Sequence, residues 1–178
     1  MEKVRERLMR ATAALEAAGI PYAVAGGNAV AAWVSRVDEA AVRNTQDVDI
    51  LIRREDLGRA KEALGAVGFV YRHAKSVDMF LDGPNAKARD AIHIVFAGEK
   101  VRPEYLTEAP TVNETEVHGG YRVLRLDSLV RMMLAALSTE DAMLMRDLID
   151  VELVDNSWLE RLSPELCARL QRLLEDPE

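Results

Sequence analysis

The chain has 178 residues, of which 49% are hydrophobic and 30% are charged, and its formal net charge is −7. This length and composition fit one compact domain, or one domain with a small helical appendage, and argue against a disordered chain. The net negative charge argues against a broad DNA- or RNA-binding surface, because such a surface needs an excess of lysine and arginine.

Membrane-spanning and targeting patterns are not apparent in the sequence, which has one cysteine. No apolar run approaches the roughly 20 residues that cross a bilayer, and the N-terminal residues lack the apolar stretch of a signal peptide. We therefore expect a cytoplasmic protein with no membrane partner. The single cysteine, Cys167, excludes an internal disulfide and a cysteine-based zinc site, and we expect it to be a small buried residue of a helix.

The first 125 residues alternate between helical and strand patterns. A helix over residues 2–18 carries its apolar face at Val4, Leu8, Ala11 and Leu15. Two further helices are predicted over residues 28–34 and 54–69. Strands are predicted over residues 22–27, 47–52, 70–82 and 90–98, and a hairpin over 114–126 that turns at Gly119 and Gly120. Residues 35–46 show no period and are expected to form a loop.

After Leu126 the pattern becomes purely helical. Asp127 is expected to cap a first helix, Ser138 or Thr139 a second, and Ser163 a third that begins at Pro164. The sequence thus predicts an α/β (α+β) fold with a mixed sheet over residues 1–125, followed by a C-terminal helical segment over 126–178.

Two glycines stand where the predicted strand at 22–27 runs into a helix. Gly26 and Gly27 would leave backbone N–H groups free at a helix N-terminus, and such groups receive phosphate oxygens. By itself, the pattern is also typical of a tight strand-to-helix turn that binds nothing.

Two aspartates open the strand at 47–52. Asp47 and Asp49 are two residues apart, so both side chains would project from one face, roughly 7 Å apart at the backbone. The two carboxylates repel each other, and a divalent cation such as Mg²⁺ or Mn²⁺ would remove that repulsion. Alternatively, Asp47 belongs to the preceding loop and both carboxylates are solvated. Together with the glycines, however, the pair predicts a site that holds a nucleoside triphosphate through a metal for attack at the α-phosphorus.

The stretch "AVAGGNAVAAW…RNTQDVDILI" resembles the signature of the DNA polymerase β-like nucleotidyltransferases. Within them it looks closest to the minimal AbiEii- or MenT-like group, some members of which are toxins of toxin–antitoxin pairs. The resemblance implies transfer of a nucleotidyl group from a triphosphate to a hydroxyl on RNA, tRNA included, or on protein, and an antitoxin as a partner. It places Asp47 and Asp49 on the metal, and the following residues at the nucleotide: Gly26, Gly27, Asn28, Thr45 and Gln46.

The third acidic residue of many relatives is missing. Histidine stands at its place, as His93 between Ile92 and Ile94, whereas Asp90 has the opposite parity along the strand. His93 is a candidate general base, since an unperturbed histidine titrates near pH 6.5. The alternative is a core histidine that is hydrogen-bonded to the backbone.

The helical segment also departs from the resemblance, which implies a lysine where Met132 and Met133 stand and an Arg-x-Lys-Asp stretch where "STED" stands. No lysine follows Lys100. Such a lysine would neutralise charge on the triphosphate. The methionines either fill the core or form an adaptable surface for a partner protein.

Three hypotheses follow. The first is a metal-dependent nucleotidyltransferase. The second is a catalytically degenerate module of the same fold that binds nucleotide or a protein partner, which the missing lysine favours. A sugar-nucleotide glycosyltransferase, which also uses Asp-x-Asp, fits the glycine pair and the short chain poorly.

Overall fold

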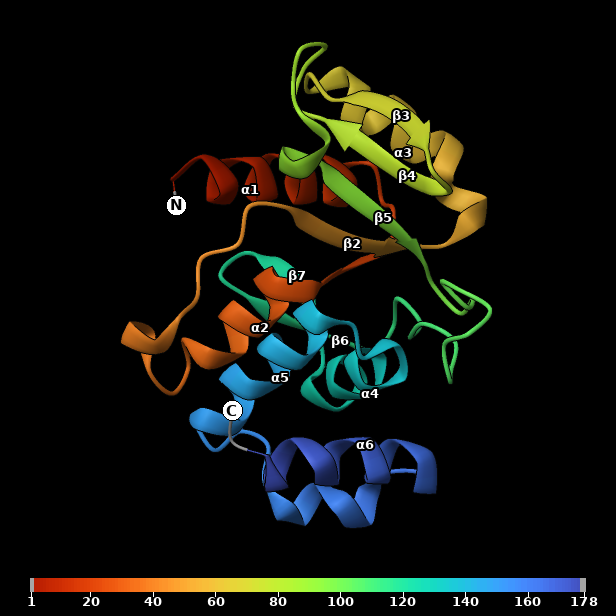
Figure 1. Ribbon diagram of the computed structural model, residues 1–178. Coiled ribbons are helices and arrows are strands. Elements are labelled where there is room, and N and C mark those ends of the chain that lie inside the picture. Colours follow the sequence, from red (N-terminus) through yellow and green to blue (C-terminus); the bar gives the residue numbers. More distant parts are fainter. Residues whose placement is uncertain (1, 177–178) are drawn as a thin grey trace.

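The computed structural model describes residues 2–176, which form one mixed sheet with helices on both faces (Figure 1). The sheet has seven strands in the order β3-β4-β5-β2-β1-β7-β6. The strands are β1 (Tyr22–Ala25), β2 (Val48–Ile52), β3 (Val70–Ala74), β4 (Val77–Leu81), β5 (Ile92–Phe96), β6 (Thr115–His118) and β7 (Tyr121–Leu124). The helices are α1 (Glu2–Ala17), α2 (Gly26–Val34), α3 (Leu57–Ala66), α4 (Leu126–Ala136), α5 (Thr139–Asp150) and α6 (Pro164–Glu175).

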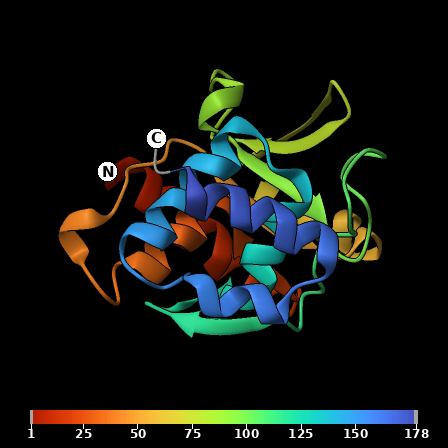
Figure 2. The same ribbon diagram turned by 60° about the horizontal axis from the view of Figure 1, so that its bottom comes forward.

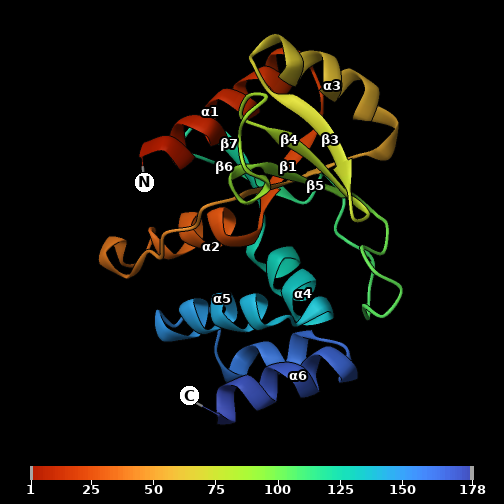
Figure 3. The ribbon, with the colours of Figure 1, turned by 45° about the horizontal axis from the view of Figure 1, so that its top comes forward.

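The helices form two unequal layers. Helices α1 and α3 cover one face of the sheet, while α2 lies against the other, with α4 and α5 packed on α2 (Figure 3). Helix α6 forms the outermost layer and packs on α4 and α5 (Figure 2). The predicted apolar faces point inward: Leu8, Ala11 and Leu15 of α1 are buried. The fold class expected from the sequence is thus the one observed.

The middle of the sheet brings the predicted site together. Strand β1 is antiparallel to β2, and β2 is parallel to β5. In this register Asp49 lies between Ala25 of β1 and His93 of β5. Because β1 is fully buried and the inner residues of β2 are apolar, the core fixes this register.

Several predicted boundaries are wrong. Residues 70–82 form the hairpin β3–β4 rather than one strand, because the chain turns at Lys75 and Ser76, both with positive φ. Helix α2 begins at Gly26, not at Asn28. Asp127 is not a cap, because α4 already begins at Leu126 with Arg125 at the N-cap position.

The other predicted caps differ in their bonding. Ser138 caps α5 in a capping box, in which its hydroxyl accepts from the N–H of Asp141 and the Asp141 carboxylate accepts from the N–H of Ser138. Ser163 occupies the N-cap position of α6 but makes no side-chain cap hydrogen bond. Cys167 is half-buried on α6. Among residues 2–176, none of the helices is long and apolar enough to span a bilayer.

Candidate active site

Positions 26 and 27 must be glycine because the side chains of Asp49 and Thr45 approach their backbone closely. Gly26 has φ +58°, and a Cβ there would lie 2.1 Å from Oδ2 of Asp49. A Cβ on Gly27 would lie 3.0 Å from Cβ of Thr45. The glycines therefore make room for the carboxylate and the threonine, in addition to opening α2 with no side-chain cap. The uncapped N–H groups of α2 lie beside the aspartates, where an anion would meet them.

Three side chains converge at this edge of the sheet. Asp47 lies immediately before β2, Asp49 lies within it and His93 lies on β5. Nδ1 of His93 is 3.5 Å from Oδ2 of Asp47 and 3.8 Å from Oδ1 of Asp49. One ligand atom from each residue lies within 4.8 Å of the others. The alternative in which Asp47 precedes the strand is thus correct for its backbone, but its carboxylate still joins Asp49.

Neighbouring residues hold Asp47 in place. The Thr45 hydroxyl donates to Oδ1 of Asp47 at 3.0 Å, and Nδ2 of Asn28 donates to the Asp47 carbonyl at 2.7 Å. Nε2 of His93 lies 3.0 Å from the carbonyl oxygen of Ala88. Asn28 is buried, so its amide positions the aspartate backbone.

The charges of the cluster act strongly on one another. The hydrogen bond to His93 holds the pKa of Asp47 below its usual range, and the same contact raises the pKa of His93. Burial, reinforced by the charge of Asp47, raises the pKa of Asp49 to about 7. A half-buried carboxylate that resists ionisation beside a second carboxylate is a site where a cation would be favourable.

The donor set fits a divalent cation. Two carboxylates and one imidazole nitrogen face a common point, and each side chain is only 25–28% exposed. Oxygen and imidazole donors are common ligands of divalent ions in proteins. Asp90, the other acidic candidate, lies in the 3-10 helix η3 (Ala88–Asp90) and does not take part in this cluster.

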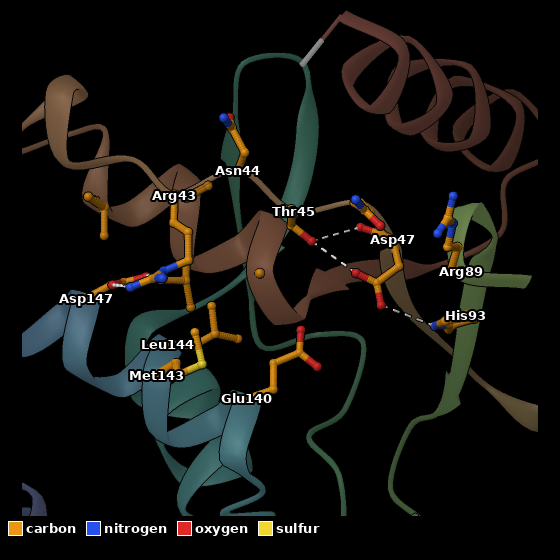
Figure 4. Close-up of a pocket in the computed structure, with 15 residues that line it drawn as sticks. Arg43, Asn44, Thr45, Asp47, Arg89, His93, Glu140, Met143, Leu144 and Asp147 are labelled. Carbon is orange, nitrogen blue, oxygen red and sulfur yellow. Dashed lines mark hydrogen bonds and ion pairs between the residues drawn. The ribbon is translucent and has the colours of Figure 1, made fainter.

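A hollow of about 480 Å³ opens beside the cluster (Figure 4). It is lined by the predicted residues Gly27, Thr45, Gln46, Asp47 and His93, and by others that the sequence analysis did not assign. Its volume is in the range of cavities that bind a small-molecule ligand or cofactor.

Two arginines supply positive charge to this hollow. Arg43 makes a two-pronged ion pair with Asp147 of α5, with distances of 2.8 and 2.7 Å. Arg89 lies on the opposite side of the hollow, near His93 (Figure 4). Arg43 stands at the start of "RNTQ" and Arg89 just before "DAIHIV", so both were next to recognised motifs, although nothing in their spacing marks them as binding residues.

A second hollow of about 190 Å³ is lined by Asp49 and shares Glu140 and Leu144 with the first. Its walls include Met132 and Met133, which stand where the resemblance implies a lysine. Its lining, all within the described part of the chain, carries four carboxylates and no lysine, arginine or histidine. The four are Asp49, Glu108, Glu140 and Asp141.

Glu140 was not singled out in the sequence, yet it lines both hollows. Its side chain points from α5 toward the first hollow, on the side facing Asp47 (Figure 4). Burial, together with the nearby charges of Asp47 and Asp141, raises the pKa of its carboxyl. No motif marks Glu140 as a site residue. It lies within "STED", which stands where the resemblance implies basic residues.

Comparisons with known proteins agree with this fold. Residues 2–173 match a family described as "uncharacterised nucleotidyltransferase". The chain is similar to ANT(2'')-Ia in complex with adenylyl-2''-tobramycin, with 15% identity and a TM-score of 0.59 over 97% of this chain and 99% of that one. A solution structure of the antibiotic-resistance factor ANT(2'')-Ia gives 16% identity and a TM-score of 0.56 over 93% of each chain. None of the curated proteins matches. At these identities, the structural likeness shows the fold alone.

Proposed function

Because this chain belongs to the nucleotidyltransferase family that it matches over residues 2–173, we propose that it is an enzyme that transfers a nucleotidyl group from a nucleoside triphosphate to a hydroxyl. The observation that carries this proposal is the convergence of Asp47, Asp49 and His93 beside the uncapped N-terminus of α2. A nucleotide site needs both parts, one for the metal and one for the phosphates.

In this proposal the triphosphate lies in the 480 Å³ hollow. Its phosphates meet the N–H group of Gly27, which lines this hollow with Thr45 and Gln46, and that of the adjacent Gly26 at the start of α2. Arg43 and Arg89 take the part of the lysine that the tail lacks, because they are the cations that line this hollow. Asp47, Asp49 and His93 hold Mg²⁺ or Mn²⁺, which when bound would supply a Lewis acid at the α-phosphoryl oxygens.

Glu140 is the proposed general base. It lies where the two hollows meet, so an acceptor hydroxyl in the second hollow and a phosphate in the first would both be near it. A general base works best when its pKa is close to the working pH, and the pKa of Glu140 is shifted upward. In this role Glu140 removes the proton of the acceptor hydroxyl as its oxygen attacks the α-phosphorus, the bond from that phosphorus to the bridging oxygen breaks, and pyrophosphate leaves.

The resemblance to the AbiEii- or MenT-like group offers RNA or protein as the acceptor, a toxin role and an antitoxin partner. Of the two acceptors, the charge of the second hollow favours protein. The metal would neutralise Asp49, but the other three carboxylates would still repel an RNA backbone, and the described lining has no lysine, arginine or histidine to offset that repulsion.

A small hydroxyl compound, neutral or positively charged, is a second candidate acceptor. The size and charge of the second hollow favour it, since 190 Å³ suits part of a small molecule and carboxylates attract ammonium groups. The neighbour ANT(2'')-Ia has been crystallised with adenylyl-2''-tobramycin, although its likeness to this chain supports only the fold.

A labelled-transfer screen tests the proposal. The protein is incubated with each α-labelled nucleoside triphosphate, Mg²⁺ or Mn²⁺, and total RNA, total protein or a set of amino alcohols. We expect transfer with at least one acceptor, and loss of transfer in Asp49→Asn. Nucleotide binding by calorimetry without any transfer would instead support the catalytically degenerate module. Neither binding nor transfer by a folded protein would refute both.

A further inference from the structure

The histidine of the cluster has a defined orientation. Its Nε2 lies 3.0 Å from the carbonyl oxygen of Ala88, and a carbonyl can only accept a hydrogen bond. Nε2 therefore carries a proton and donates it. Nδ1 faces Asp47 and Asp49 at 3.5 and 3.8 Å. Without a metal this nitrogen donates its proton to Asp47, and release of that proton leaves a lone pair that can bind a cation. Since Nε2 is engaged by the Ala88 carbonyl, Nδ1 is the ring atom of His93 that can bind a cation held between the two carboxylates.

The backbone makes this orientation rigid. His93 pairs with Asp49 on one side and with Met79 of β4 on the other, so it lies in the interior of the sheet. Ala88 belongs to η3, the short turn that immediately precedes β5, so the accepting carbonyl is built into the approach to the strand. Histidines that bind metals typically donate their second ring N–H to a backbone carbonyl or a carboxylate.

We infer that His93 binds the divalent cation through Nδ1, and that the site consequently prefers a first-row transition ion, with Mn²⁺ as the representative, over Mg²⁺. This rests on the proposed function, which puts a cation between Asp47 and Asp49. Mg²⁺ favours oxygen ligands in near-ideal octahedral geometry. First-row ions accept imidazole readily, and Mn²⁺ also suits carboxylates. The same role removes His93 from the candidates for general base, because its lone pair is engaged.

Spectroscopy of the bound ion tests the inference without reference to turnover. Pulsed electron paramagnetic resonance of the Mn²⁺-loaded protein reports nitrogen nuclei bound to the metal. We expect nitrogen coupling in the unmodified protein, and a change from ¹⁴N to ¹⁵N coupling when the protein is made with ¹⁵N-histidine. This measurement needs no variant, so it stands even if a substitution at His93 fails to fold.

A matched pair of variants then identifies the histidine and measures the preference. His93→Asp should abolish the nitrogen coupling. It should also reduce the ratio of Mn²⁺ to Mg²⁺ affinity, measured by calorimetry, at least about tenfold, because even the loss of a residue that only hydrogen-bonds to a metal ligand lowers metal affinity about 10–100-fold. His73→Asp is the control, because His73 is the other histidine within 4 Å of a carboxylate among residues 2–176, at 3.1 Å from Asp78. It should leave both quantities unchanged.

The outcomes separate the inference from the proposed function. Tight Mn²⁺ binding without nitrogen coupling, or an unchanged metal preference in His93→Asp, would overturn the role of His93 and leave the proposed nucleotidyl transfer intact. No binding of either ion by the folded protein, alone or with a nucleoside triphosphate, would overturn the inference and the proposed metal dependence together. Loss of the nitrogen coupling in His73→Asp would show that the bound nitrogen belongs to His73, and would overturn the role of His93.

Discussion

Asp49 carries the strongest electrostatic conflict of the candidate site. Burial and the charge of Asp47 raise its pKa to about 7, whereas an aspartate of an unfolded chain titrates near 3.9. The folded protein thus holds a proton that the unfolded chain has lost between about pH 4 and pH 7. The free energy of unfolding of the metal-free protein should fall as pH rises through this window, and stay reduced above it.

We therefore expect Asp49→Asn to stabilise the metal-free protein at pH 8 by about 1–4 kcal/mol and to change little at pH 4. Denaturant titrations at the two pH values measure the difference. Added Mn²⁺ should reverse the order, because it would stabilise the unmodified protein and not the variant. An equal effect at both pH values would show that the gain does not come from the ionisation of Asp49.

Glu140 is the residue whose chemical role is most open to a kinetic test. If it takes the proton of the acceptor hydroxyl, Glu140→Gln should lower kcat about 10²–10⁴-fold and leave the KM for the triphosphate nearly unchanged. The acidic limb of the pH–rate profile should disappear as well. Glu108→Gln is the control, since Glu108 lines only the second hollow. A similar fall in both variants would indicate acceptor binding rather than proton transfer.

At the scale of elements, the junction between β1 and α2 depends on a single glycine. Gly26→Ala would combine a positive φ with a Cβ 2.1 Å from Oδ2 of Asp49. We expect a loss of stability of roughly 1–3 kcal/mol from the backbone alone, and weaker Mn²⁺ binding because the Asp49 carboxylate must move. Gly58→Ala in α3 is the matched control, since nothing lies within 4 Å of its added Cβ.

Gly58→Ala should leave the stability unchanged or raise it by less than about 1 kcal/mol, because Gly58 lies in the first turn of α3, where the preference for alanine over glycine is smaller than in a helix interior. Thermal unfolding and calorimetric Mn²⁺ titration of both variants provide the comparison. Unchanged metal binding in Gly26→Ala would mean that the close approach to Asp49 is not needed for the site.

The sequence predicted the elements whose signal is local. Buried periodicity identified α1, β1 and the tail helices, and the two glycines at 119 and 120 identified the β6–β7 turn. The β3–β4 turn was missed because Lys75 and Ser76 adopt positive φ without the glycine or asparagine that usually signals it. The start of α2 was misplaced because Gly26 belongs to a helix while having a left-handed φ.

The residues of the candidate site likewise fall into those that a local pattern predicted and those that only the fold brings to the site. Side chains alternate along strands, so parity predicted that Asp47 and Asp49 share one face. His93 was identified through the resemblance, at the place of the third acidic residue, and the pairing of β2 with β5 sets it beside Asp49. Glu140 reaches the site because α5 packs against α2, and the same packing brings Asp147 to Arg43; no local pattern encodes this approach between segments distant in sequence. The role of Gly26 and Gly27 as space for Asp49 and Thr45 could likewise not be read before the fold was known.

At the scale of the whole molecule, the tail helices share one hydrophobic core with the sheet. Helices α4 and α5 pack on α2, and a single cluster of buried side chains joins them to β1 and β2. The buried residues of the tail in this cluster include Leu129, Leu134, Leu144, Met145 and Leu148. The division into residues 1–125 and 126–178 remains a prediction, and this shared core argues that neither part is stable alone.

Truncation tests that argument. A chain that ends at Arg125 would expose the face of α2 that α4 and α5 cover, and would remove Glu140 from the site; we expect it to lose its cooperative thermal transition. A chain that ends at Leu162 loses only α6, with its buried Leu166 and Leu170. It should keep a single transition at lower temperature, since each buried leucine contributes about 1.5–3 kcal/mol. Circular dichroism follows both, and a sharp transition in residues 1–125 would establish an independent domain.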